Sequence, residues 1–278
     1  MGVIQNAAIT GRDDLLRMCL QRARGFPTWN FGKLEAVLLD AVNGAIRAAQ
    51  TEVINTLYEF WTNHWNPTKR YPFGTWLRLV AQCGSVETAQ VVVPIAMAHG
   101  VSRYLLANEA CKSNSADIIR YMLDKNLLSA ESSLGSYTLR QAVVFGNREI
   151  ARELIYRGAN IKGSGLGASL THTCFQRYNP SMLLFLIGWK CVLSPWTLRA
   201  AEREMSEMQI WPYPGRQNIQ RKLCYYIIAK TRRTAAPSAW YIDCSELDAF
   251  TRRMDRDKGW KVLVEGLVKS WDSLKHPV

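Results

Sequence analysis

The sequence has 278 residues, of which 48% are hydrophobic and 21% are charged, so it can bury a core and lacks the composition of a disordered protein. Its formal net charge of +12 leaves two interpretations open: a solvated basic surface, or an acidic partner such as nucleic acid, a lipid headgroup or an acidic protein face. The start of the chain lacks the basic flank and apolar core of a secretory signal, and no apolar run is long enough to span a bilayer. We therefore expect no transmembrane segment and a soluble protein of the cytoplasm or nucleus.

The seven cysteines form no CxxC pair, and the four histidines are scattered. An odd number of cysteines without a regular framework favours free, mostly buried thiols in a reducing compartment. No cluster of histidine and cysteine has the spacing of a zinc site. The sequence therefore predicts neither a structural metal nor a cofactor.

In chain order, the first feature is a short pattern that recurs: a helix with small residues, a turn, and a second helix with apolar residues. It occupies residues 7–16 and returns near 45–54, 80–87, 110–119 and 139–155. A weaker copy at 173–187 has about one extra residue in its turn, and a degenerate copy begins at Leu198. The first small residues of the six clearest copies are Ala7, Ala45, Val80, Ala110, Ala142 and Thr173. This spacing scatters around the roughly 33 residues of a known class of helical repeat.

Each residue type in the pattern has a physical reason. Two antiparallel helices approach closely only where small side chains line their contact. Gly11, Gly84, Asn114 and Gly146 follow the first helix, where a left-handed backbone is wanted and glycine or asparagine adopts it at low cost. One such unit cannot bury its own apolar face, whereas stacked units can.

The best copy, residues 139–161, contains Gly146-Asn147 and ends on Gly-Ala-Asn-Ile. It resembles the ankyrin-repeat consensus nearly position for position, and residues 132–139 resemble the hairpin and helix start of that family, with Thr138 in place of the usual proline. The resemblance covers about residues 3–205. It implies an all-α fold, an ankyrin-repeat solenoid of about six to seven helix-turn-helix units with a C-terminal helical cap. Another solenoid of helical pairs is the alternative.

Three segments depart from the repeat. Residues 61–76 predict a long aromatic loop that either covers the edge of the stack or contacts a ligand. Residues 208–242 contain no acidic residue and interleave cations with aromatics, which suits either a basic capping helix or phosphate contact with base stacking. Residues 245–248 predict a capping-box helix start. We therefore expect a solenoid over 1–236, with a divergent last repeat at 196–236, and a cap over 237–278 packed on it.

By the same resemblance, ankyrin proteins bind other proteins on a concave face made of hairpin tips and first-helix residues. Arg140 and Arg199 stand where the family usually has a histidine. The candidate binding residues are Arg47, Lys112, Val144, Phe145 and Phe175 on first helices, Tyr137 and Trp196 on the hairpin side, Trp65 and Tyr71 in the long loop, and Arg232 and Arg233 in the basic stretch.

We expect a non-catalytic scaffold that binds an acidic and apolar protein segment. Two alternatives stay open: a basic and aromatic nucleic-acid-binding module, and a small-molecule cyclase or isomerase with a Trp-rich pocket closed by Trp65, Tyr71 and His99 or His172. The sequence contains no nucleophile elbow, HExxH, Walker loop or dinucleotide fingerprint. We therefore assign no catalytic residue.

Overall fold

The computed structural model describes residues 2–24, 31–64, 72–161, 166–208, 216–232 and 243–272. These residues form sixteen α-helices and no strand, so the prediction of an all-α fold is confirmed. No described helix has both the length and the apolar character needed to cross a membrane. The chain divides into two compact units, Met1–Ser129 and Ala130–Val278.

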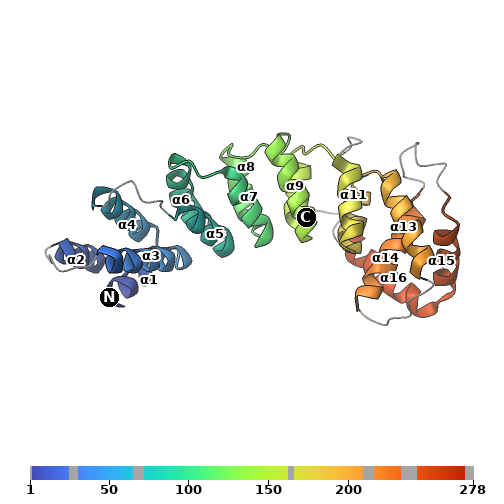
Figure 1. Cartoon of the computed structure of the whole chain (residues 1–278), viewed down its shortest axis with the longest axis horizontal. Helices are drawn as coiled ribbons and strands as arrows, with labels where there is room; N and C mark the ends of the chain where they lie inside the picture. Colours follow the sequence, from blue (N-terminus) through green and yellow to red (C-terminus); the bar gives the residue numbers. More distant parts are fainter. Residues whose placement is uncertain are drawn as a thin grey trace. The chain divides into compact units, whose positions relative to one another are not determined.

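Unit 1 is a series of four helical pairs (Figure 1). The pairs are α1 (Gly2–Ile9) with α2 (Asp13–Arg24), α3 (Phe31–Arg47) with α4 (Thr51–His64), α5 (Phe73–Cys83) with α6 (Val86–Ala98), and α7 (Arg103–Lys112) with α8 (Ala116–Asp124). The first helices contact one another in succession, α1 with α3, α3 with α5 and α5 with α7, and the second helices do the same from α2 to α8. The pairs of unit 1 therefore stack in two layers.

Unit 2 also contains four helical pairs. They are α9 (Ser133–Phe145) with α10 (Arg148–Tyr156), α11 (Leu166–Gln176) with α12 (Pro180–Gly188), α13 (Pro195–Met208) with α14 (Arg216–Thr231), and α15 (Ser245–Arg256) with α16 (Lys258–Asp272). The first helices α9, α11, α13 and α15 again contact one another in succession, while α12 contacts both α14 and α16. The predicted cap thus contains a helical pair of its own. The predicted boundary at 236–237 lies outside the described residues and stays a prediction.

The turn inside each of the first six pairs contains a residue with left-handed backbone. These residues are Gly11, Ala49, Gly84, Asn114, Gly146 and Tyr178. In five of the six turns, the next backbone N–H bonds the carbonyl oxygen five residues earlier, as Asn147 does with Ala142 at 2.8 Å. This is the hydrogen bond of a Schellman motif, which satisfies a carbonyl at the end of the first helix. The predicted left-handed turns at Gly11, Gly84, Asn114 and Gly146 are confirmed.

The core of each pair lies where the small residues meet the apolar stripe of the second helix. Ala7, Ala45, Ala81, Ala110 and Ala142 are almost completely buried. Apolar residues on the second helices are equally buried, among them Leu16, Ile54, Val92, Ile119 and Leu154. Alanine allows close approach of the two helices, and the branched side chains supply the apolar area that stabilises the pair, about 1.5–3 kcal/mol for each fully buried one.

Two predicted segments differ from the structure. Residues 133–137 are not a hairpin: α9 begins at Ser133, because the hydroxyl of Ser132 accepts a hydrogen bond from the backbone N–H of Gly135 and caps the helix there. The long loop is shorter than 61–76, since Trp61 lies in α4 and Trp76 in α5, both buried with their rings edge to face at 6.2 Å.

The cap of α15 also differs from the prediction. The helix begins at Ser245, but no side chain at its N-cap residue Cys244 makes a capping bond. Instead the carboxylate of Glu202 in α13 accepts from the backbone N–H groups of Glu246 at 2.6 Å and Leu247 at 3.1 Å. A tertiary contact therefore supplies the acceptor and negative charge that favour a helix N-terminus.

Candidate binding surface

The ends of the first helices nearest the left-handed turns form an exposed row in unit 1. Arg47, Gln82, Cys83 and Lys112 are exposed, and so is 48% of Ile9. These residues precede equivalent turns on α1, α3, α5 and α7, which contact one another in succession. We call these five residues, together with the exposed Arg78 six residues before the turn at Gly84, the turn-end row.

A buried carboxylate anchors two cations of this row. Glu109 is only 8% exposed. Its Oε1 lies 2.9 Å from the Lys112 ammonium and 4.0 Å from Arg78 Nε. A buried carboxylate needs such partners. One carboxylate between two cations leaves a local positive charge, and both cations are about half exposed at their side chains.

Cys83 lies at the surface of the same row as a free thiol. Partial burial raises its pKa, and the nearby charge of Arg47 only partly opposes this. The group therefore stays a neutral thiol near pH 7 and lacks the thiolate character of a nucleophile.

In unit 2 the corresponding positions are more apolar. Phe145 is 41% exposed and Val144 half-buried at the end of α9. Phe175 is buried, which contradicts its prediction as a surface residue. The cause is the register of the turn: the left-handed residue is Tyr178, so Phe175 occupies the core position of Val143. The two residues before this turn are Gln176 and Arg177, both exposed.

The starts of α9 and α13 carry the other predicted contacts of unit 2. Trp196 is 70% exposed, and the guanidinium carbon of Arg199 lies 5.7 Å from the centre of its ring. Tyr137, the fifth residue of α9, is half-buried. An exposed tryptophan beside an arginine combines the residue types that dominate binding energy in many interfaces.

A polar cluster links the turn between α11 and α12 with α13 and α14. Glu204 Oε2 accepts hydrogen bonds from Tyr178 Oη at 3.1 Å, Tyr225 Oη at 2.7 Å and Arg221 at 2.9 Å. Burial first, then the bond to Glu204, raises the pKa of Tyr225. His172 lies close by, with its Nδ1 3.3 Å from the Thr197 hydroxyl, and burial lowers its pKa against the opposing charge of Glu204. Through these hydrogen bonds, Glu204 in α13 holds α14 and the turn after α11 in place.

The remaining predicted residues fall into two groups. Arg232 is ion-paired with Asp248 at 2.7 Å, a bond between α15 and the end of α14. Trp65, Tyr71 and Arg233 lie outside the described residues, and so does the pocket that Trp65 and Tyr71 were expected to close. His99 was another candidate for that pocket. Its Nε2 shares a hydrogen bond with Tyr58 Oη at 3.0 Å, and its ring stacks on that of Phe73 with 4.4 Å between the ring centroids.

Sequence reasoning missed Arg78, Glu109 and Arg177. Arg78 stands six residues before the turn at Gly84, and Glu109 stands five residues before the turn at Asn114. At these positions the repeat pattern does not predict whether a side chain is buried. Within the described part of the chain, no group of three or more histidine, cysteine, aspartate or glutamate side chains is placed to hold a metal ion. A scan against protein-family models finds no match for this chain. A search of curated proteins likewise finds no match.

Proposed function

We propose that this chain is an ankyrin-type repeat scaffold that binds a protein segment containing acidic and apolar residues along the first helices of unit 1. The protein acts in a reducing compartment, the cytoplasm or nucleus, in line with its free and mostly buried cysteines.

The ankyrin assignment is supported by the regularity of the turns. Asn114, Gly146 and Tyr178 adopt left-handed backbone at intervals of 32 residues, and Asn126, Gly158 and Lys190 do so 12 residues after each of them. Over these three pairs, the fixed interval means one structural unit repeated, close to the roughly 33 residues of ankyrin repeats. The earlier left-handed turns, from Gly11 to Asn114, are spaced by 38, 35 and 30 residues. The helical start of α9 and the arginine at position 140 are departures from that family's pattern.

The observation that carries the binding proposal is the charge of the turn-end row. On the four successive first helices of unit 1, residues 6–10, 43–48, 78–83 and 108–113 contain three cations, Arg47, Arg78 and Lys112, and a single anion, Glu109, which is buried between two of them. Ile9 adds an exposed apolar contact. A surface with exposed cations and an exposed aliphatic side chain complements a segment of opposite charge and similar apolarity.

A display library of random peptides sorted against the full chain tests this proposal. We expect enrichment of peptides that combine aspartate or glutamate with leucine, isoleucine or phenylalanine. In fluorescence anisotropy, Arg47→Glu and Lys112→Glu should each weaken the enriched peptide at least five-fold, because each reverses a charge in the row. Lys125→Glu is the matched control, since Lys125 is exposed beyond the end of α8 and outside the row.

Two results would overturn the proposal. The first is a library with no acidic enrichment. The second is equal loss of affinity in Lys125→Glu, which would mean that net charge, and not the row, attracts the peptide.

One observation favours nucleic acid as a second candidate, the exposed Trp196 with Arg199 beside its ring. Base stacking with a nearby cation suits single-stranded RNA or DNA. Affinity for a 20-nucleotide poly(U) strand should then fall steeply with salt and drop with Trp196→Ala. A flat salt dependence would exclude this function.

A further inference from the structure

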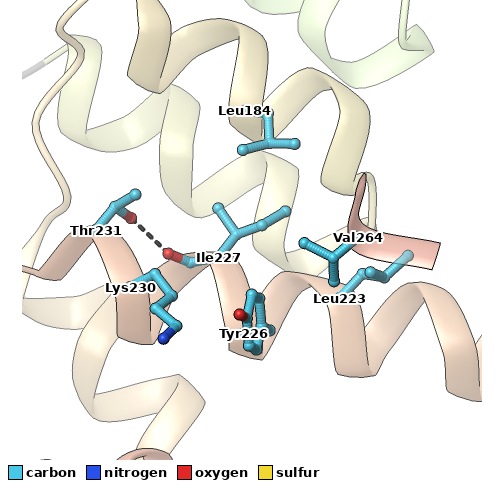
Figure 2. Close-up of a pocket in the computed structure, with 7 residues that line it drawn as sticks. All are labelled: Leu184, Leu223, Tyr226, Ile227, Lys230, Thr231 and Val264. Carbon is cyan, nitrogen blue, oxygen red and sulfur yellow. Dashed lines mark hydrogen bonds between the residues drawn. The ribbon is translucent and has the colours of Figure 1, made fainter. Parts of the chain in front are cut away.

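Unit 2 contains an apolar pocket that the binding row does not use. It lies between α12, α14 and α16 and has a volume of about 230 Å³. Leu184 contributes from α12 and Val264 from α16, and the remaining wall comes from one face of α14 (Figure 2). That face consists of Leu223, Tyr226, Ile227, Lys230 and Thr231.

The polar atoms around the pocket are directed elsewhere. The Lys230 ammonium lies 2.7 Å from Asp255, and Tyr226 Oη donates to the same carboxylate at 2.8 Å. The Thr231 hydroxyl donates to the backbone carbonyl of Ile227 at 2.6 Å, the bond drawn in Figure 2. Figure 2 also shows the Lys230 nitrogen pointing away from Leu184. The pocket therefore presents hydrocarbon, with its polar neighbours already bonded.

These features fix the chemistry of an occupant. A charged or strongly hydrogen-bonding group would lose its water without gaining a partner, at a cost of about 1–3 kcal/mol for each unmet hydrogen bond. An apolar group has no hydrogen bonds to water to lose, and it gains contacts with Leu184, Ile227 and Val264. The volume exceeds the roughly 150 Å³ of an apolar cavity that accepts benzene.

We propose that this pocket binds a small uncharged apolar ligand, an aromatic ring with a short alkyl chain or a hydrocarbon group of similar size. Such a ligand contacts α12, α14 and α16 at once. Binding therefore ties α16 to α12 and α14 and stabilises the folded form in proportion to ligand occupancy.

The experiment uses n-butylbenzene with the full chain. At a free concentration ten times the Kd, the melting temperature should rise by about 3–6 °C. Methyl NMR signals of Leu184, Leu223, Ile227 and Val264 should shift in the same titration. Amides of α16 should also exchange more slowly with solvent when the ligand is bound.

Paired variants separate the pocket from general hydrophobic binding. Val264→Phe fills the pocket from α16 and should abolish the ligand-induced rise. Val262→Phe is the matched control, because Val262 is in the same helix but 69% exposed, and it should keep the rise. Leu184→Phe fills the pocket from the opposite wall, so that the test stands if one filled variant fails to fold.

The proposal is overturned if n-butylbenzene leaves the melting temperature and these methyl signals unchanged. It is equally overturned if folded Val264→Phe or Leu184→Phe keeps the full rise. Both results are independent of peptide binding at the turn-end row, so the two proposals succeed or fail separately.

Discussion

The hydroxyl of Ser115 donates a hydrogen bond to the backbone carbonyl of Ala81, 34 residues earlier in the preceding helical pair. Ser115 directly follows the left-handed residue Asn114, and Ala81 lies in the last turn of α5. Similar proximity recurs elsewhere: Asn179 lies against Gly146 in unit 2. The residue after each of these turns thus reaches the turn of the pair before it and sets the register between neighbouring pairs.

Ser115→Ala should destabilise the chain by about 1 kcal/mol, because it removes the donor to a carbonyl at the contact between two pairs. The midpoint of chemical denaturation measures this loss. Ser113→Ala in the same turn is the control and should stay within about 0.5 kcal/mol of the unchanged chain. Equal effects of the two substitutions would contradict the proposed role of Ser115.

Gly146→Ala should cost about 1–2 kcal/mol. Its φ of +77° disfavours any residue with a Cβ. A Cβ there would also lie 2.8 Å from the amide nitrogen of Asn179. Gly266→Ala in α16 should instead stabilise by up to about 1 kcal/mol, since no atom lies within 4 Å of its added Cβ and alanine favours helix. Thermal unfolding of both variants distinguishes backbone strain from a general effect of glycine replacement.

Glu204→Ala should be among the most damaging single changes in unit 2, at about 2–4 kcal/mol. It leaves Tyr178, Tyr225 and Arg221 without their shared acceptor in a partly buried cluster. Glu207→Ala, an exposed position in the same helix, should change the free energy of unfolding by less than about 0.5 kcal/mol. If Glu204→Ala unfolded no more easily than Glu207→Ala, the cluster would not hold α13, α14 and the turn after α11 together.

Stability should fall as the pH drops through about 6.5, in part because of His172. Burial holds the pKa of His172 below its ordinary value of 6.5 in the folded state. At a pH between the folded-state and unfolded-state pKa values of His172, the unfolded chain binds more protons than the folded chain. The unfolded fraction therefore increases as the pH falls. His172→Gln should therefore lessen the loss of stability between pH 7.5 and pH 5.5, while its offset from the unchanged chain stays constant from pH 7.5 to pH 9. Denaturation midpoints across this range measure both.

Much of the architecture was predictable because the repeat couples residue type to local backbone. Gly11, Gly84, Asn114 and Gly146 each mark a turn that the structure confirms. The same logic failed at Ala49 and Tyr178, which adopt left-handed backbone without being glycine or asparagine. For Tyr178, the hydrogen bond from its hydroxyl to Glu204 and the contact of its ring with Arg221 accompany that conformation, and both partners lie at least 26 residues away along the chain.

What the sequence determined by itself is therefore the all-helical class, the pairing of helices and most of the turns, because periodic apolar positions and glycine act within a few residues. Only the tertiary structure decided the cap of α15 by Glu202, the burial of Phe175, the charge triad around Glu109 and the pocket between α12, α14 and α16. Each of these features depends on contacts between side chains from separate helices. Tertiary packing decides such contacts between residues far apart in the sequence, and local sequence patterns do not predict them.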